Sequence, residues 1–186
     1  ILATDCVGFS KRMDENEELT LENLKACRSI IDPQIKEFGG RIFYTAGDSV
    51  IAEFESPVEC VNAAIGFQKA INDRNNTIPQ ESRLDWRVGI HLDDVIIEGD
   101  NVYGNGVNIA ARLETACAPK QILLSTAVQD QVNKRISFTI EDAGTKSLKN
   151  IDEAFQVYGI SPSGEKISKT DALKEKDAQE AIKSYK

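Results

Sequence analysis

Apolar positions along this chain recur with two spacings, and each spacing indicates a kind of element. Three stretches, residues 16–38, 57–74 and 107–117, carry apolar side chains every three or four positions, which is typical of amphipathic helices. Ser56-Pro57 supplies an N-cap and a proline at the first helical position of the second stretch. Pro33 lies inside the first stretch, where it is expected to bend or interrupt the helix.

Shorter apolar runs predict strands, because their side chains alternate or stand together over about four to eight positions. Two such runs, joined by Gly47-Asp48, predict a hairpin over residues 41–54. Residues 84–92 are expected to pair with a returning strand at 95–97. The remaining predictions are strands at residues 1–5, 121–125, 136–140 and 155–160, a short helix at 126–132 and a loop at 144–150.

Helices in this order alternate with hairpins rather than with single strands. The order predicts an α+β fold, a sandwich of a mostly antiparallel sheet with covering helices, rather than a doubly wound parallel sheet. Residues 1–160 are predicted to form one domain. Ser161-Pro-Ser-Gly164 is typical of a linker, and residues 161–186 are expected to be a charged linker or tail, either helical or frayed.

Charge narrows the classes of ligand. The 186 residues include 22 Lys and Arg against 30 Asp and Glu, a net charge of −8. A negative chain argues against general binding to nucleic acid or to anionic membranes, which needs a basic surface. A nucleotide that carries its own Mg²⁺ remains compatible, because it needs only a few local cations. No apolar stretch approaches the roughly 18 residues of a membrane-spanning helix, so this segment is expected to make no membrane contact.

The four cysteines, Cys6, Cys27, Cys60 and Cys117, show none of the spacings of zinc or haem sites. Cys27 and Cys60 fall at apolar positions of predicted helices, which favours buried free thiols over disulfides. Free thiols indicate a reducing compartment, so we expect a cytoplasmic domain.

Two aspartates are candidates for metal chemistry. Asp48 stands at the tip of the predicted hairpin, where Asn or Ser would suit the turn equally well. Asp5 ends the first predicted strand. Two carboxylates brought together at strand ends form an oxygen site for Mg²⁺. The alternative, two solvated turn residues without a ligand, stays open from the pattern alone.

The residues after Asp5 suggest a phosphate site. Cys6-Val-Gly-Phe-Ser10 predicts a sharp, glycine-containing turn from the strand into a helix. Backbone N–H groups in such a turn, together with a helix N-terminus, hold phosphate oxygens. Gly8, Phe9 and Ser10 are therefore candidate substrate-binding residues.

Asn108 and Arg112 are four positions apart on a predicted helix, so they share a face. Arg112 could neutralise charge on a phosphoryl group while Asn108 orients a sugar or phosphate oxygen. A surface helix, in which Arg112 pairs with Glu114 or with solvent, is the alternative. His91, the single histidine, fits a structural role in a strand better than the role of a catalytic base. No GxxxxGK[ST] phosphate loop is present.

Several stretches together resemble the catalytic domain of the class III adenylate and guanylate cyclases. The resemblance lies in Ile1–Ser10, Thr45–Ser49, Arg87–His91 and Val102–Glu114, while Gly144–Tyr158 is similar to the end of the domain in the bacterial branch. These stretches occur in the family's order and at its separations, which makes the combination specific. The resemblance covers about residues 1–160.

This resemblance implies a ferredoxin-like core and a head-to-tail homodimer with two active sites at the interface. Asp5 and Asp48 would bind two Mg²⁺ or Mn²⁺ ions, and the backbone carbonyl of Cys6 would be a further ligand. Asn108 and Arg112 of the opposite protomer would position the ribose and stabilise the transition state as the 3′-oxygen attacks the α-phosphorus.

The resemblance also implies substrate contacts for Lys149, Tyr44 and Asn101. Lys149 is similar to the lysine that reaches the terminal phosphates. Adenylate cyclases of the family usually read adenine with a lysine where this chain has Tyr44, and with Asp or Thr where it has Asn101. A tyrosine hydroxyl can donate to adenine N1, and an Asn side chain can serve either adenine N6 or guanine O6. Asp93 stands where the family usually has glycine, so a strained or shifted turn is expected there.

The leading hypothesis is an adenylate cyclase that converts ATP to 3′,5′-cyclic AMP and pyrophosphate. One alternative is a guanylate cyclase that uses GTP. Another is a catalytically weak, cyclase-like module that binds nucleotide and acts as a regulatory dimer. A diguanylate cyclase is disfavoured, because the chain has no GGDEF-type turn.

Overall fold

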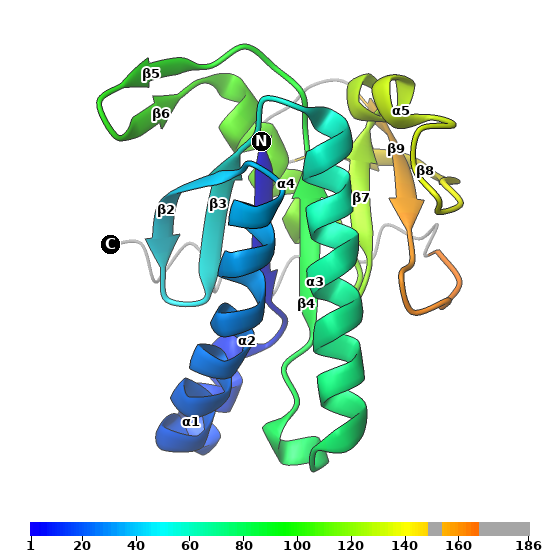
Figure 1. Cartoon of the computed structure of the whole chain (residues 1–186). Coiled ribbons are helices and arrows are strands. Elements are labelled where there is room, and N and C mark those ends of the chain that lie inside the picture. Colours follow the sequence, from blue (N-terminus) through cyan, green and yellow to red (C-terminus); the bar gives the residue numbers. More distant parts are fainter. Residues whose placement is uncertain (149–153, 168–186) are drawn as a thin grey trace.

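A seven-stranded sheet forms the centre of the computed structural model, which describes residues 1–148 and 154–167 (Figure 1). Its strand order is β2-β3-β1-β4-β7-β9-β8, and every neighbouring pair is antiparallel except β4 and β7. The strands are β1 (Leu2–Cys6), β2 (Arg41–Ala46), β3 (Ser49–Glu53), β4 (Trp86–Ile90), β7 (Ile122–Ser125), β8 (Glu141–Ser147) and β9 (Ala154–Ile160).

Five α-helices accompany the sheet in the described part of the chain. Asn16 caps the long helix α2, because its Oδ1 accepts the Leu19 N–H at 3.0 Å, and α2 continues through Pro33 rather than ending there. Ser56 caps α3 as predicted, accepting the Glu59 N–H at 3.3 Å. The helices are α1 (Phe9–Glu15), α2 (Glu17–Glu37), α3 (Pro57–Thr77), α4 (Asn105–Ala116) and α5 (Thr126–Val132), with a 3-10 turn at Gln80–Ser82.

The first part of the chain has ferredoxin-like topology. Its elements follow the order β1, α2, β2, β3, α3, β4, and its strands lie in the order β2-β3-β1-β4. This split β-α-β arrangement places each helix as a crossover between strands separated by one neighbour. The predicted α+β class with a mostly antiparallel sheet is confirmed.

Side-chain alternation divides the sheet into two packed faces. Leu2 lies opposite Ala52 and Ile90, and these residues face the larger core formed with α2 and α3. On the other face, Gly89 lies directly beneath α4. Figure 1 shows α2 and α3 in front of the sheet and α4 behind it. The smaller core on the α4 face consists of Ile109, Leu113, Cys117, Leu123, Ala143, Leu148, Val157 and Ile167.

One predicted strand forms but pairs with a different partner, and another predicted strand does not form. Residues 95–97 do not return along β4; instead, β5 (Ile96–Glu98) pairs with β6 (Asn101–Tyr103) in a separate two-stranded sheet. Residues 136–140 are not a strand. Instead, β8 runs over Glu141–Ser147, so residues 144–147 of the predicted loop belong to a strand. Ile136, Phe138 and Ile140 pack at the edge of the larger core, so their alternation reflects burial without strand pairing.

All four cysteines are free and buried, which confirms the prediction of buried free thiols. Within the described residues, no helix is both long and apolar enough to cross a bilayer.

The close approach of α4 to the sheet depends on Gly89. A Cβ at this position would collide with backbone atoms of α4, the Glu114 nitrogen and the Ala110 oxygen. We expect Gly89→Ala to lower the free energy of unfolding by about 1–3 kcal/mol, because neither backbone can move locally. Urea denaturation followed by circular dichroism measures this change.

Gly66→Ala is the matched control. Gly66 lies inside α3, and an added Cβ there would meet only the end of the flexible Gln34 side chain. Alanine favours a helix over glycine by up to about 1 kcal/mol, so this variant should be neutral or slightly more stable. Equal destabilisation of both variants would contradict the special role of Gly89.

Candidate active site

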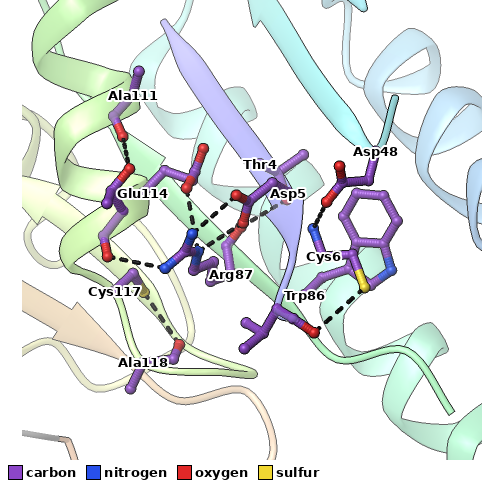
Figure 2. A network of polar contacts seen from close by, with 12 residues as sticks. Thr4, Asp5, Cys6, Asp48, Trp86, Arg87, Ala111, Glu114, Cys117 and Ala118 are labelled. Atoms are coloured by element: carbon purple, nitrogen blue, oxygen red, sulfur yellow. Dashed lines mark hydrogen bonds and ion pairs between the residues drawn. The ribbon is translucent and has the colours of Figure 1, made fainter. Parts of the chain in front are cut away.

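The two candidate metal aspartates lie side by side at one edge of the sheet. Asp5 is near the end of β1, and Asp48 is in the tight turn between β2 and β3. The turn folds over the end of β1, so that the Cys6 N–H donates to Asp48 Oδ2 at 2.9 Å (Figure 2). Gly47 adopts a φ of 57° in this turn, a conformation that favours glycine. The structure therefore brings together two carboxylates that are 43 positions apart in the sequence (48 − 5).

Arg87 binds Asp5 through both oxygens. It lies directly opposite Asp5 in the pairing of β1 with β4. Its Nε donates to Asp5 Oδ1 at 2.6 Å and its Nη2 donates to Oδ2 at 2.9 Å. Both side chains are mostly buried, at 17% and 21% exposure. This two-pronged contact fixes the plane of the Asp5 carboxylate.

A third carboxylate joins this group from α4. Arg87 Nε lies 3.2 Å from Glu114 Oε1, and Arg87 Nη1 donates to the Thr115 carbonyl at 3.0 Å. Figure 2 shows the Arg87 guanidinium between Asp5 and Glu114. Neither Arg87 nor Glu114 was predicted from the sequence as a site residue. The strand and helix patterns place Arg87 and Glu114 at buried positions. A charged residue at a buried position is unusual, and this signal could have identified both.

Burial and like charge act on the carboxylates. Burial raises the pKa of Asp48 from 3.8 to about 6; the nearby Asp5 charge adds to this rise, and the Cys6 N–H opposes it. The pKa of Glu114 is raised well above its usual value, again chiefly by burial, with the Asp5 charge adding to the effect and Arg87 opposing it. These carboxylates are thus held close together at an electrostatic cost that a bound cation would relieve.

The donor set fits a hard divalent cation. Carboxylate oxygens are the ligands that Mg²⁺ and Mn²⁺ prefer. Asp48 has no ion pair with any other described residue, although it is mostly buried. Across residues 1–148 and 154–167, no cluster of three or more His, Cys, Asp or Glu side chains could hold a metal. Two side chains alone leave coordination positions for backbone or substrate oxygens.

A β-bulge directs Tyr44 toward the same face as Asp5. In the pairing of β2 with β3, Ile42 lies opposite Ala52, but Tyr44 lies opposite Ile51, so Phe43 is the extra residue. Ile51 pairs with Ala3, two positions before Asp5, which places Tyr44 on the Asp5 face. The Tyr44 side chain is 41% exposed there. Regular alternation would have placed it on the opposite face, with Ile42.

Asn101 lies on an element next to Tyr44 in the same chain. It begins β6, and Arg41 of β2 donates to the Asp100 carbonyl at 3.2 Å. The two side chains expected to read the base therefore come from neighbouring elements, β2 and β6, of one protomer.

The helix α4 carries Asn108 and Arg112. Asn108 is exposed and Arg112 is half-buried, and neither makes a hydrogen bond or ion pair to Asp5 or Asp48 in the described structure. The alternative pairing of Arg112 with Glu114 is wrong, because Glu114 contacts Arg87 instead.

The remaining sequence candidates fall into three groups. Gly8, with a φ of 71°, is the N-cap residue of α1, and Phe9 and Ser10 are the first residues of that helix, so the predicted strand-to-helix turn is present. Lys149 lies outside the described residues. His91 is 9% exposed, stacks edge-on against Phe155 at 6.0 Å, and has its pKa lowered by burial, which fits a structural histidine.

The chain is similar to known cyclases in sequence and in fold. A family model for the adenylate and guanylate cyclase catalytic domain matches residues 1–161. The chain belongs to this family. It is 33% identical over 163 residues to "Putative adenylate cyclase 3" of Rhizobium meliloti, an alignment that covers 87% of this chain and 28% of that protein.

Solved structures show the same fold. The cyclase domain matches the crystal structure of an adenylate/guanylate cyclase/hydrolase from Silicibacter pomeroyi with a TM-score of 0.81 and 34% identity, over 87% of this chain and 95% of the other. It also matches the adenylyl cyclase CyaB from P. aeruginosa, with a TM-score of 0.72 and 21% identity over 86% and 91% of the two chains. The chain thus spans less than a third of its Rhizobium relative but nearly all of these solved domains.

The raised pKa of Asp48 predicts that the cyclase domain carries an unfavourable carboxylate when no metal is bound. Between about pH 4 and pH 6 the folded state binds a proton at Asp48 more tightly than the unfolded state, so stability falls as pH rises through this range. Asp48→Asn keeps an oxygen acceptor for the Cys6 N–H and removes the charge. In the presence of a chelator, we expect it to raise the free energy of unfolding at pH 7 by about 1–2 kcal/mol, with no gain below about pH 4.

Urea titrations of both proteins across this pH range measure the difference. Asp94→Asn, at an exposed aspartate, is the control and should leave stability unchanged at every pH. A destabilised Asp48→Asn protein at pH 7 would show that the carboxylate supports the fold rather than a ligand.

Proposed function

We propose that this domain is an adenylate cyclase that converts ATP to 3′,5′-cyclic AMP and pyrophosphate in sites shared by two copies of the chain. The observation that carries the proposal is the pair of neighbouring, mostly buried aspartates in a domain of the cyclase family. Asp48 forms no salt bridge among the described residues, although burial and Asp5 make its charge unfavourable. A divalent cation with a triphosphate would supply the missing charge.

Asp5, Asp48 and the backbone carbonyl of Cys6 would hold two Mg²⁺ or Mn²⁺ ions. When bound, such ions lower the pKa of the ribose 3′-hydroxyl and neutralise the triphosphate. Arg87 keeps the Asp5 carboxylate in one orientation, and the Cys6 N–H keeps that of Asp48. The turn that contains Gly8, Phe9 and Ser10 follows directly and would bind phosphate oxygens through its N–H groups.

Asn108 and Arg112 would act on a substrate held by the partner copy. In the reaction, the 3′-hydroxyl would release its proton to solvent as its oxygen forms a bond to the α-phosphorus. The bond between the α-phosphorus and the oxygen bridging to the β-phosphate would break, and pyrophosphate would leave with that electron pair. Arg112 would stabilise the negative charge that develops at the α-phosphoryl group, and Asn108 would hold the ribose in line. Lys149 would contact the terminal phosphates.

Exposed apolar side chains support assembly as a dimer. Ile96, Ile97 and Tyr103 of the β5–β6 hairpin, together with Leu92 before it, are 40–65% exposed. An apolar hairpin of this kind is typical of a surface that another protein covers. A head-to-tail homodimer would cover it and would bring α4 of one copy to the aspartates of the other. Residues 1–160 would form this catalytic unit, with residues 161–186 as its linker or tail.

The choice of ATP over GTP rests on Tyr44 and Asn101. The Tyr44 hydroxyl would donate to adenine N1, and the Asn101 carbonyl would accept from the N6 amine. The name of the Rhizobium relative also favours ATP. A guanylate cyclase is the second candidate, because the Asn101 amide could instead donate to guanine O6. A weakly active regulatory module is a third candidate, because Tyr44 replaces the usual base-reading lysine.

The first test is turnover. Purified protein at high concentration is incubated with Mn²⁺ and either ATP or GTP, and the products are separated by chromatography. We expect cyclic AMP from ATP, at a higher kcat/KM than that for cyclic GMP from GTP. If neither cyclic AMP nor cyclic GMP forms, the domain is not a cyclase, and the regulatory module is favoured.

A mixing experiment tests the shared sites. Asp5→Ala and Arg112→Ala should each be inactive alone, because each defect affects both sites of a homodimer. Mixed in equal amounts, they should recover about a quarter of the wild-type rate, because half of the dimers contain one intact site. Size-exclusion chromatography confirms dimers in each sample. No recovery in a sample that contains heterodimers would place each site within one protomer.

Tyr44→Phe tests the reading of the base. Loss of one neutral hydrogen bond, worth about 1 kcal/mol, should lower kcat/KM for ATP about fivefold. Tyr158→Phe is the control. Tyr158 lies on β9, which is separated from β2 by four strands of the sheet, so loss of its hydroxyl should leave kcat/KM unchanged. An unaltered kcat/KM in Tyr44→Phe would remove Tyr44 from the base pocket.

A further inference from the structure

Arg41 is a half-buried arginine on the edge strand β2, and the proposed reaction gives it no role. It lies opposite Glu53 in the pairing of β2 with β3, and its Nε and Nη2 contact Glu53 Oε1 at 2.7 and 2.6 Å. The remaining nitrogen, Nη1, donates to the Asp100 carbonyl at 3.2 Å. One guanidinium therefore joins the hairpin β2–β3 to the turn of the hairpin β5–β6.

The hairpin β5–β6 has few other attachments. It forms a two-stranded sheet of its own, and Figure 1 shows it beside β2 and β3 but separate from the large sheet. Val102 is buried, whereas Asn101 and Tyr103 on either side of it are exposed. Across residues 1–148 and 154–167, no other hydrogen bond or ion pair links residues 96–103 to the seven-stranded sheet. The bond from Arg41 is thus the polar contact that fixes the turn of this hairpin against the sheet.

This bond acts on the peptide group next to Asn101. The Asp100 carbonyl and the Asn101 nitrogen belong to one planar peptide unit, and Asn101 pairs with Glu98 to close the turn. Fixing the carbonyl therefore limits where the Asn101 side chain can lie. Because that side chain is exposed, packing against other side chains does not hold it in place.

Arg41 also shares a face of β2 with Tyr44. Arg41 lies opposite Glu53 and Tyr44 lies opposite Ile51, two positions away on β3, so both side chains stand on the same side of the sheet. Without the extra residue of the bulge, a separation of three positions would place them on opposite sides. Arg41 therefore connects the strand that carries Tyr44 with the peptide group that carries Asn101.

We infer that Arg41 is a positioning residue that fixes Asn101 relative to Tyr44 and thereby sets the preference between ATP and GTP. The inference rests on the proposed function, because it takes Tyr44 and Asn101 as contacts to the base. It assigns Arg41 no contact with the nucleotide. A displacement of about 1 Å is enough to break a hydrogen bond between Asn101 and a base.

The test is the ratio of kcat/KM for ATP to kcat/KM for GTP, measured with the whole chain and Mn²⁺. This ratio does not depend on the fraction of protein that is folded or dimeric, so a general loss of stability leaves it unchanged. Asn101→Ala is the reference variant and should lower the ratio about fivefold, because one neutral hydrogen bond to the base is lost. Arg41→Gln should lower it about threefold, because Asn101 remains but is no longer held in place.

Arg28→Gln is the matched control. Arg28 pairs with Asp32 on α2 at 2.7 Å, in a partly exposed ion pair that lies outside the hairpins β2–β3 and β5–β6. Loss of this ion pair should leave the ratio unchanged.

The double variant Arg41→Gln/Asn101→Ala separates positioning from a general structural role. If Arg41 acts through Asn101, the ratio in the double variant equals that in Asn101→Ala alone, because no side chain remains to be positioned. Independent effects would instead multiply to a loss of about fifteenfold, and that result would overturn the inference.

The outcomes also separate this inference from the proposed function. If Asn101→Ala lowers the ratio but folded Arg41→Gln matches the wild type, the role of Arg41 is wrong and the base contact stands. If Asn101→Ala leaves the ratio unchanged, or the wild type forms no cyclic nucleotide, the proposed function is wrong on that point and the inference fails with it. Circular dichroism establishes that each variant is folded. Should Arg41→Gln not fold, Arg41→Lys replaces it. Lysine keeps a charge for Glu53 but lacks the planar fork that reaches two acceptors at once, and an unchanged ratio would then overturn the inference.

Discussion

The pairing of Asp5 with Arg87 joins the elements on which the site depends. It links β1 to β4 across the middle of the sheet, and through Glu114 and Thr115 it links both strands to α4. One guanidinium thus sets the orientation of a candidate metal ligand and the position of the helix that carries Asn108 and Arg112. The absence of a side chain at Gly89 makes this possible, because it lets the α4 backbone come close enough for Glu114 to reach Arg87.

The candidate site holds several carboxylates close together, and their negative charges contribute little to the stability of the fold. Asp48 accepts a hydrogen bond from the Cys6 N–H, but its burial and the neighbouring Asp5 both disfavour its ionised form. Buried carboxylates without cationic partners are common at functional sites for this reason: their cost is offset only when a ligand is bound. Tyr44 and the apolar side chains of the β5–β6 hairpin are likewise exposed to solvent, so they are available to contact a ligand or another protein.

Much of the architecture could be predicted from local patterns. The spacing of apolar residues and the identity of the turn residues predicted the hairpin at Gly47-Asp48 and the helix cap at Ser56. Each of these features depends on a few adjacent residues. The wrong predictions came from local patterns that are compatible with two different structures. Residues 136–140 alternate because they cover the edge of a core, and residues 95–97 pair forward with β6 rather than back with β4. Pro33 stands within a helix that the surrounding apolar face maintains by packing.

The sequence by itself determined the α+β class, the family resemblance and the residue types available for metal and phosphate binding. Those properties lie in spacing, turn residues and motif order, which the chain carries without folding. Only the tertiary structure decided that Arg87 and Glu114 surround Asp5, because that contact depends on the register of β1 with β4 and on the height of α4 above Gly89. It also decided which way Tyr44 points, because one extra residue at Phe43 reverses the alternation along β2, and no periodicity in the sequence reveals where a bulge will form.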